Sequence, residues 1–402
     1  MQQSTQRFRS VHGYLLLIWV LVGCSGDLSP SAVPEGSGAA ATPQVQSGSV
    51  RAWSGGLKAW SGGIRAWGGG GSAGDSGAVL LENGAIWDRL SLTVAHQVLA
   101  PRLGEGVVVA VVDTGIDYGH PIFQDRLVGQ ALWRDFVDGD DDPQEVQGAA
   151  FGHGTVVASL VAQVAPAAQL MPLRVLDGDG SGSPEDVAAA VDWAAANGAD
   201  IVQLSLGTEV PAAAIEAAVE RATAGGVYVV ASAGNSNRNP TYPAYTAMLA
   251  GPVGDMSVGV GSVDLQDLKS AFSNFAPEDG PIDDGLEMVA FGESVYGAVP
   301  GGQIAAWDGT SMAAPLVAGA LALALGDGAE ALSPRTLALE VVESGLEIDA
   351  EGSANGTPFE LEQRLEIGLF LCSALNLSAP QCQEAFDDAF DDDDDDGDDD
   401  DD

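Results

Sequence analysis

The stretch VAVVDTG at residues 109–115 is the part of the chain that decides the fold. Its apolar half belongs to a run of β-branched residues, 107–112, and such a run predicts a fully buried strand. Asp113 follows directly. It therefore stands at the carboxyl end of the strand, where open α/β sheets place their sites.

Strand and helix patterns alternate along the rest of this region. Further strands are predicted at 170–175, 201–206 and 227–231, and helices at 155–164, 185–197, 212–224 and 312–325. This alternation predicts an α/β fold with a mostly parallel central sheet and helices on both faces.

Two other motifs supply a base and a hydroxyl group: GHGT at 152–155 and GTSMAAP at 309–315. A serine hydroxyl is a weak nucleophile until a base removes its proton. A histidine can be that base when a buried aspartate fixes its tautomer and stabilises its charged form. Asp113 alone is more typical of a turn or cap, but Asp113, His153 and Ser311 together predict nucleophilic catalysis.

These three motifs, in this order, resemble those of the subtilisin-like serine peptidases, and the resemblance covers roughly residues 80–345. VVASAGN at 229–235 is similar to the segment that carries the family's oxyanion-hole asparagine, which implies that role for Asn235. The resemblance implies a subtilisin-like fold and a serine endopeptidase that cleaves peptide or protein substrates through an acyl-enzyme. It implies no cofactor for the chemistry.

The resemblance also implies how a substrate binds. Ser205, Leu206 and Gly207 resemble the edge segment that pairs with the substrate backbone, so a peptide is expected to bind as an added strand. Ala233 and Gly234 are expected to line the other side of the first specificity pocket. Thr208 replaces a glycine that is common in the family, which leaves the details of substrate pairing open.

Residues 1–24 have the pattern of an export signal. An apolar run at 14–22 follows a basic start and is too short to span a bilayer. LVGC at 21–24 resembles a bacterial lipobox, which implies lipidation of Cys24 and a lipid-anchored enzyme in the cell envelope, at the outer membrane of a Gram-negative cell. The alternative is an ordinary signal peptide with an incidental cysteine.

Residues 25–78 are predicted to be a Gly/Ser-rich linker. It contains a seven-residue repeat: RAWSGGL (51–57), KAWSGGI (58–64) and RAWGGG (65–70). Each unit offers a cation, a Trp and a flexible turn. It is suited either to a membrane interface or cell wall or to docking on the catalytic domain. The segment does not resemble a compact inhibitory propeptide.

The catalytic domain is predicted at 79–345, followed by an extension at 346–386 and a disordered Asp-rich tail at 387–402. Within the extension, export to an oxidising compartment predicts a disulfide between Cys372 and Cys382, with two free thiols as the alternative.

The chain has 15 Lys and Arg against 58 Asp and Glu, a net charge of −43, which disfavours nucleic acid as a partner. The acidic loop at 138–142 is either a structural calcium site or a solvated loop. A different class of function is a catalytically silent lipoprotein that keeps the fold as a binding module. Within the protease class, neither a scavenging nor a processing role is favoured.

Overall fold

The computed structural model describes residues 50–52, 65–66, 79–208, 211–238, 257–275, 288–329, 334–348, 352–354, 357–359, 363–377 and 382. All of them belong to one compact unit, Val45–Asp402. The export signal, Cys24 and the Asp-rich tail lie outside the described residues.

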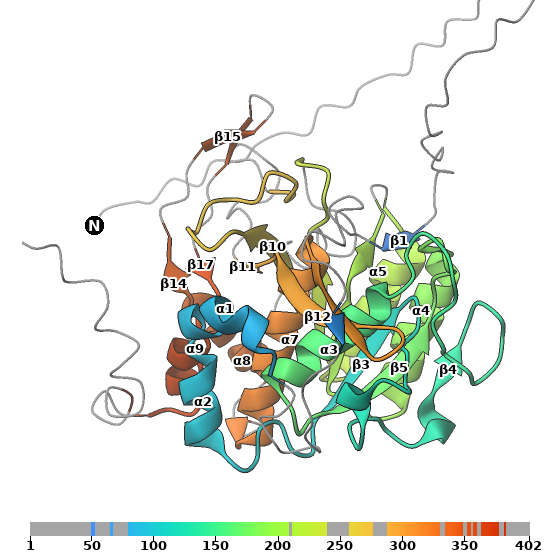
Figure 1. Cartoon of the computed structure of the whole chain (residues 1–402), viewed down its shortest axis with the longest axis horizontal. Helices are drawn as coiled ribbons and strands as arrows, with labels where there is room; N and C mark the ends of the chain where they lie inside the picture. The colour runs from blue at the N-terminus through green and yellow to red at the C-terminus, as the bar shows by residue number, and fades with distance from the viewer. Residues whose placement is uncertain are drawn as a thin grey trace, which may run out of the picture. The chain divides into compact units, whose positions relative to one another are not determined.

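A nine-stranded sheet forms the centre of the unit, in the order β14-β17-β11-β10-β9-β7-β3-β5-β4 (Figure 1). Neighbouring strands are parallel except for the pair of β14 and β17. In chain order the strands are β3 (Val108–Asp113), β4 (Arg134–Asp135), β5 (Gln169–Arg174), β7 (Ile201–Leu204), β9 (Tyr228–Ser232), β10 (Ser257–Val263), β11 (Met288–Phe291), β14 (Leu346–Glu347) and β17 (Gln363–Arg364). The predicted α/β fold is confirmed.

Helices cover both faces of this sheet. They are α1 (Gly84–Arg89), α2 (Leu92–Leu99), α3 (His153–Val164), α4 (Pro184–Ala196), α5 (Ala213–Ala224), α7 (Thr310–Gly326), α8 (Pro334–Glu343) and α9 (Ile367–Ala374). Alternate residues of β3 enter two separate clusters of buried side chains. Val109 and Val111 pack in the cluster that includes α3 and α7, whereas Ala110 and Val112 pack in the cluster that includes α4 and α5. Because both faces are covered, the strand is an unbroken apolar run.

Helices α3 and α7 pack directly against each other. A Cβ atom on Gly319 of α7 would lie 2.5 Å from the Cβ of Val164 in α3, so only a residue without a side chain fits at this contact. Helix α7 is buried on all sides from Thr310 to Ala324, and its sequence is apolar around its whole circumference. The position of either helix therefore fixes the position of the other.

Smaller sheets flank the central one. A hairpin of β12 (Val295–Val299) and β13 (Gln303–Trp307) pairs with β2 (Arg65–Ala66), and a second hairpin joins β15 (Gly352–Ala354) to β16 (Thr357–Phe359). A third small sheet has the order β6-β1-β8, with β1 (Val50–Ala52) between β6 (Ser181–Gly182) and β8 (Leu206–Gly207). The described parts of the linker are thus paired strands.

One prediction from the sequence needs correction. The strand predicted at 201–206 ends at Leu204, because Ser205 leaves the central sheet and the next two residues join the sheet of β6 and β1. The extension predicted after residue 345 contributes to the central sheet, since its strand β17 pairs with β11. Helix α9 also adds buried side chains, among them Phe370 and Leu371, to the main core.

Candidate active site

Ser311 lies in the first turn of α7 and is buried. Its hydroxyl donates a hydrogen bond to the carbonyl oxygen of Ser205, with an Oγ–O distance of 3.2 Å. The amino terminus of α7 places the positive end of the helix dipole beside this hydroxyl. An anion that forms next to Ser311 would be stabilised there.

Pro315 accounts for a second contact between Ser311 and Ser205. In an α-helix the N–H group of residue 315 would donate to the carbonyl of residue 311, but proline has no N–H group. The Ser205 hydroxyl donates to that carbonyl instead, at 2.8 Å, and Gln203 Nε2 donates to the Ser205 hydroxyl at 2.9 Å. Ser205, predicted from the sequence only as a substrate-binding residue, therefore also holds the backbone of Ser311.

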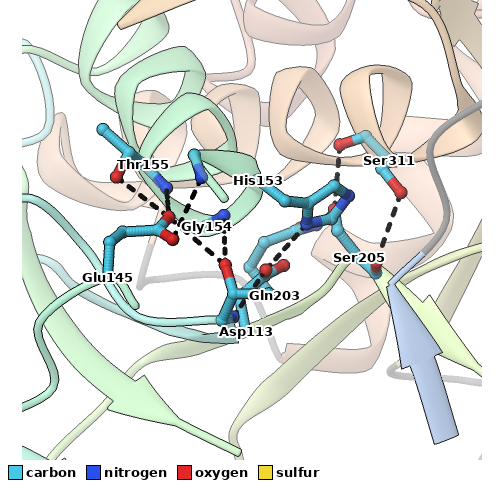
Figure 2. Close-up of polar contacts among 10 residues, drawn as sticks. Asp113, Glu145, His153, Gly154, Thr155, Gln203, Ser205 and Ser311 are labelled. Atoms are coloured by element: carbon cyan, nitrogen blue, oxygen red, sulfur yellow. Dashed lines mark hydrogen bonds and ion pairs between the residues drawn. The ribbon is translucent and has the colours of Figure 1, made fainter. Parts of the chain in front are cut away.

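His153 is the first residue of α3, and its ring lies between Asp113 and Ser311 (Figure 2). His153 Nδ1 and Asp113 Oδ1 are 2.7 Å apart, and both side chains are 1% exposed. The same Asp113 oxygen accepts a hydrogen bond from the backbone N–H of Thr114, also at 2.7 Å. Because the carboxylate is fixed in this way, it can hold the imidazole in one orientation and leave Nε2 on the other side of the ring.

Asn235 follows strand β9, and its amide is oriented by Thr310. The Oδ1 atom accepts from the backbone N–H of Thr310 at 2.9 Å and from the Thr310 hydroxyl at 3.0 Å. The Nδ2 group is buried and has no hydrogen-bond partner within the part of the chain that the structure describes. A buried donor without a partner is costly unless it binds something else, so this group is suited to a ligand oxygen.

The predicted pocket residues come from β8 and from the segment after β9. Leu206 and Gly207 form β8, and Ala233 and Gly234 come between β9 and Asn235. Gly234 has a φ of +101°, a conformation that favours glycine, and its N–H donates to the Thr310 hydroxyl. The Ala233 side chain is fully buried and belongs to the main core. Gly234 therefore helps to orient the Asn235 amide through Thr310.

Glu145 is a component of the site that no sequence motif marks. Its Oε2 accepts from the Gly152 N–H at 3.0 Å, and its Oε1 accepts from both the N–H and the hydroxyl of Thr155 at 3.0 Å (Figure 2). The Thr114 hydroxyl also donates to Oε1, at 3.2 Å, and accepts from the Gly154 N–H. The carboxylate thus caps the helix that begins at His153 and ties it to the residue after Asp113.

Burial raises the pKa of Glu145 from 4.5 to about 7, and the nearby charge of Asp113 adds to the rise, although the hydrogen bonds from Gly152 and Thr155 oppose it. A carboxyl whose pKa is raised on folding stabilises the protein fully below the unfolded pKa, and this contribution is lost as pH rises through the folded pKa. For Glu145 this stabilisation is lost between the unfolded and the folded pKa, from about pH 4.5 to about pH 7. The shift corresponds to about 3 kcal/mol.

Glu145→Gln is expected to remove this pH dependence. The free energy of unfolding of the wild type should fall from pH 5 to pH 8 by up to about 3 kcal/mol more than that of the variant. The variant should also be less stable at pH 5. Its amide N–H₂ group would face the Gly152 N–H, and two donors cannot form a hydrogen bond with each other. Urea unfolding at several pH values measures both effects, with Glu105→Gln, an exposed position, as the control. If the difference in unfolding free energy between the wild type and Glu145→Gln does not change with pH, the raised pKa of Glu145 is contradicted.

The acidic loop beyond β4 is tied to basic side chains. Arg174 forms ion pairs with Asp135 and Asp138, and Arg134 pairs with Asp141. Asp142 accepts a hydrogen bond from the Tyr118 hydroxyl at 3.0 Å. Across the described ranges no three His, Cys, Asp or Glu side chains are grouped to hold a metal ion. A structural calcium stays a prediction.

Cys372 and Cys382 are joined by a disulfide, with their Cα atoms 5.5 Å apart. Cys372 is part of α9, which packs in the main core. The bridge therefore ties residue 382 to α9.

Comparison with known proteins identifies the family. The sequence model of the subtilase family matches residues 104–356. Subtilisin Savinase of Lederbergia lenta is 40% identical over 230 residues, which are 55% of this chain and 76% of that protein. Thermitase of Thermoactinomyces vulgaris is 37% identical over 243 residues, 58% of this chain and 79% of that protein.

Solved structures agree. The crystal structure of a cold-adapted subtilisin-like serine proteinase superimposes with a TM-score of 0.54 at 32% sequence identity, covering 64% of this chain and 88% of that one. The family match extends over more than half of the chain and includes all the residues of the site described above. The chain therefore belongs to the subtilase family and is a subtilisin-like serine endopeptidase.

Proposed function

We propose that the protein is an exported, lipid-anchored endopeptidase of the bacterial cell envelope that cleaves polypeptides with Asp113, His153 and Ser311 as its catalytic triad. The observation that carries the chemistry is the buried 2.7 Å contact of His153 Nδ1 with Asp113 Oδ1, beside a serine held at a helix amino terminus. In that arrangement the imidazole is oriented to remove the serine proton.

The reaction follows from these positions. Ser311 Oγ attacks the carbonyl carbon of the substrate while His153 Nε2 takes the hydroxyl proton, and Asp113 stabilises the resulting imidazolium. The developing oxyanion accepts hydrogen bonds from Asn235 Nδ2 and the Ser311 backbone N–H; in subtilisin, losing the asparagine lowers turnover about 10²–10³-fold. His153 then protonates the leaving amine, and water releases the acyl group by the same steps in reverse.

The lipid anchor rests on the sequence around Cys24. Across the described residues, no helix has both the length and the apolar character needed to cross a bilayer. Acyl chains on Cys24 would hold the enzyme at a membrane without a spanning segment.

Fluorophosphonate labelling of fractionated cells tests both parts of the proposal. The wild-type full chain should be labelled at Ser311 in the membrane fraction, and Cys24→Ala should be labelled equally but appear in the soluble fraction. A folded chain that takes no label would instead favour a silent binding module. Labelled Cys24→Ala that stays with the membrane would rule out anchoring through this cysteine.

A further inference from the structure

Asn274 is a buried asparagine beside the turn that carries Asn235. It lies in the segment 269–275, which follows β10, and it is 0% exposed. The turn itself comes directly after β9 and includes residues 233–238. A buried asparagine needs hydrogen-bond partners for both its amide nitrogen and its oxygen. Asn274 finds partners for both atoms in this turn.

The Asn274 side chain holds the turn on both sides of Asn235. Its Nδ2 donates to the carbonyl oxygen of Ala233 at 2.9 Å, on the side nearer β9. Its Oδ1 accepts from the Ser236 N–H at 2.9 Å and from the Arg238 N–H at 3.2 Å, on the other side. Because the amide group is planar and rigid, it fixes the spacing between the two ends of the turn.

Further hydrogen bonds join the same two segments. The Asn274 N–H donates to the Gly234 carbonyl at 2.9 Å, and the Asn237 N–H donates to the Phe272 carbonyl at 2.9 Å. Lys269 adds a side-chain contact, in which its Nζ donates to Asn237 Oδ1 at 2.8 Å. The segment that carries Asn274 therefore supports the turn along its length.

The amide of Asn235 is oriented from one direction by Thr310. Asn235 Oδ1 accepts from both the N–H and the hydroxyl of Thr310, and that hydroxyl accepts from the Gly234 N–H at 3.0 Å. These contacts fix the direction of Asn235 Nδ2 only while the backbone of Asn235 keeps its place. The bonds from Asn274 to the residues on each side of Asn235 supply this second constraint.

The place of Asn235 Nδ2 matters because an oxyanion hole acts through its geometry. A donor is effective when it lies about 2.7–3.1 Å from the position that the oxyanion will occupy. A misplacement of about 1 Å can cost about 10²-fold in rate. A residue that keeps the backbone of Asn235 in place can therefore affect kcat without contacting the substrate.

We propose that Asn274 is a positioning residue for the oxyanion donor Asn235, and that it acts through the backbone of the turn on either side of Asn235. The inference rests on the proposed function, in which Asn235 Nδ2 donates to the developing oxyanion. The hydrogen bond to the oxyanion is made by Asn235, and Asn274 holds the donor where that bond can form.

Steady-state kinetics of Asn274→Asp in the purified full chain, with and without Asn235→Ala, test the proposal. Asn274→Asp keeps an accepting oxygen but sets a second oxygen against the Ala233 carbonyl. In the wild-type background kcat should fall about tenfold or more, while KM for a chromogenic peptide stays within about twofold. In the Asn235→Ala background the same substitution should change kcat by less than about twofold, because the donor that Asn274 positions is absent.

Asn197→Asp is the matched control. Asn197 Nδ2 donates to the Trp193 carbonyl at 2.8 Å at the end of α4, so the substitution exchanges a donor for an acceptor in the same way. Because α4 carries none of the site residues, kcat should stay within about twofold of wild type. Circular dichroism shows whether each variant is folded. If Asn274→Asp does not fold, Asn274→Ser, which keeps a hydroxyl group, takes its place in the same comparison.

The outcomes separate a positioning role of Asn274 from a purely structural one. An equal fold-loss of kcat in both backgrounds would overturn the inference, because Asn274 would then act on the fold and not through Asn235. A raised KM with unchanged kcat would also overturn it and assign the contact to the pocket residues Ala233 and Gly234.

The Asn235→Ala variant by itself separates this inference from the proposed function. If Asn235→Ala loses turnover but the Asn274 variant keeps the wild-type kcat, this inference is wrong and the proposed function stands. If Asn235→Ala keeps the wild-type turnover, the oxyanion role of Asn235 in the proposed function fails, and this inference fails with it.

Discussion

Replacing Ser311 with Ala is expected to lower kcat/KM for a chromogenic peptide by about 10⁶-fold, the magnitude known from subtilisin itself. In the proposed mechanism the hydroxyl oxygen forms the acyl-enzyme, and no other described side chain of the site is placed to replace it. The loss should appear in kcat, because the substrate is expected to pair with the backbone of β8 and not with this hydroxyl. Steady-state kinetics of the purified variant, free of contaminating wild-type enzyme, measures the loss.

The fold should survive this substitution. Ser311 Oγ donates a long hydrogen bond to the Ser205 carbonyl, and the Ser205 hydroxyl still has the residue 311 carbonyl to donate to. Circular dichroism should therefore be unchanged. Ser344→Ala is the matched control and should keep full activity. It removes a hydroxyl just after α8 that donates to the Glu340 carbonyl within that helix. Activity within tenfold of wild type in Ser311→Ala would exclude Ser311 as the nucleophile.

Asp113→Asn is expected to lower kcat about 10⁴-fold while leaving the structure in place. The amide is nearly the same shape as the carboxylate, but it cannot stabilise the imidazolium of His153. With its N–H₂ group toward the ring, it would also favour the wrong tautomer. A kcat profile against pH measures the loss. The loss should be largest in the pH range in which the wild-type reaction passes through the imidazolium form of His153.

Asp125→Asn is the matched control for this change. Asp125 is exposed and has a φ of +62°, a conformation that asparagine adopts readily, so the control should be folded and fully active. Equal activity of Asp113→Asn and Asp125→Asn would mean that the buried contact with His153 is structural only.

The sequence was sufficient to predict the elements and residues that local patterns encode. The run before Asp113 predicted β3, and the helical pattern at 185–197 predicted α4, whose start is capped by the Ser183 hydroxyl, which accepts from the Asp186 N–H at 3.0 Å. His153 and Ser311 lie in short glycine-rich motifs that also begin helices. Each of these signals lies within a few residues, so it can be read without knowing the fold.

The features that were missed depend on contacts between distant parts of the chain. Glu145 stands in an unremarkable loop, and its role arises only because the loop folds back on the first turn of α3. Strand β17 is two residues long, too short for any periodic pattern, yet it pairs with β11. Pro315 was visible in its motif, but the consequence for the Ser311 carbonyl requires knowing that Ser205 lies beside it.

The contact of Gly319 with Val164 has a consequence for engineering heat resistance. Replacing a helical glycine with alanine usually stabilises a helix by about 0.5–1 kcal/mol. At position 319 the added carbon would stand 2.5 Å from Val164, so the helices that carry the nucleophile and the base would have to separate. The distance between His153 and Ser311 thus depends on the contact of Gly319 with Val164, which lies well along both helices. Gly319 should therefore be left unchanged when the protein is stabilised by consensus substitutions.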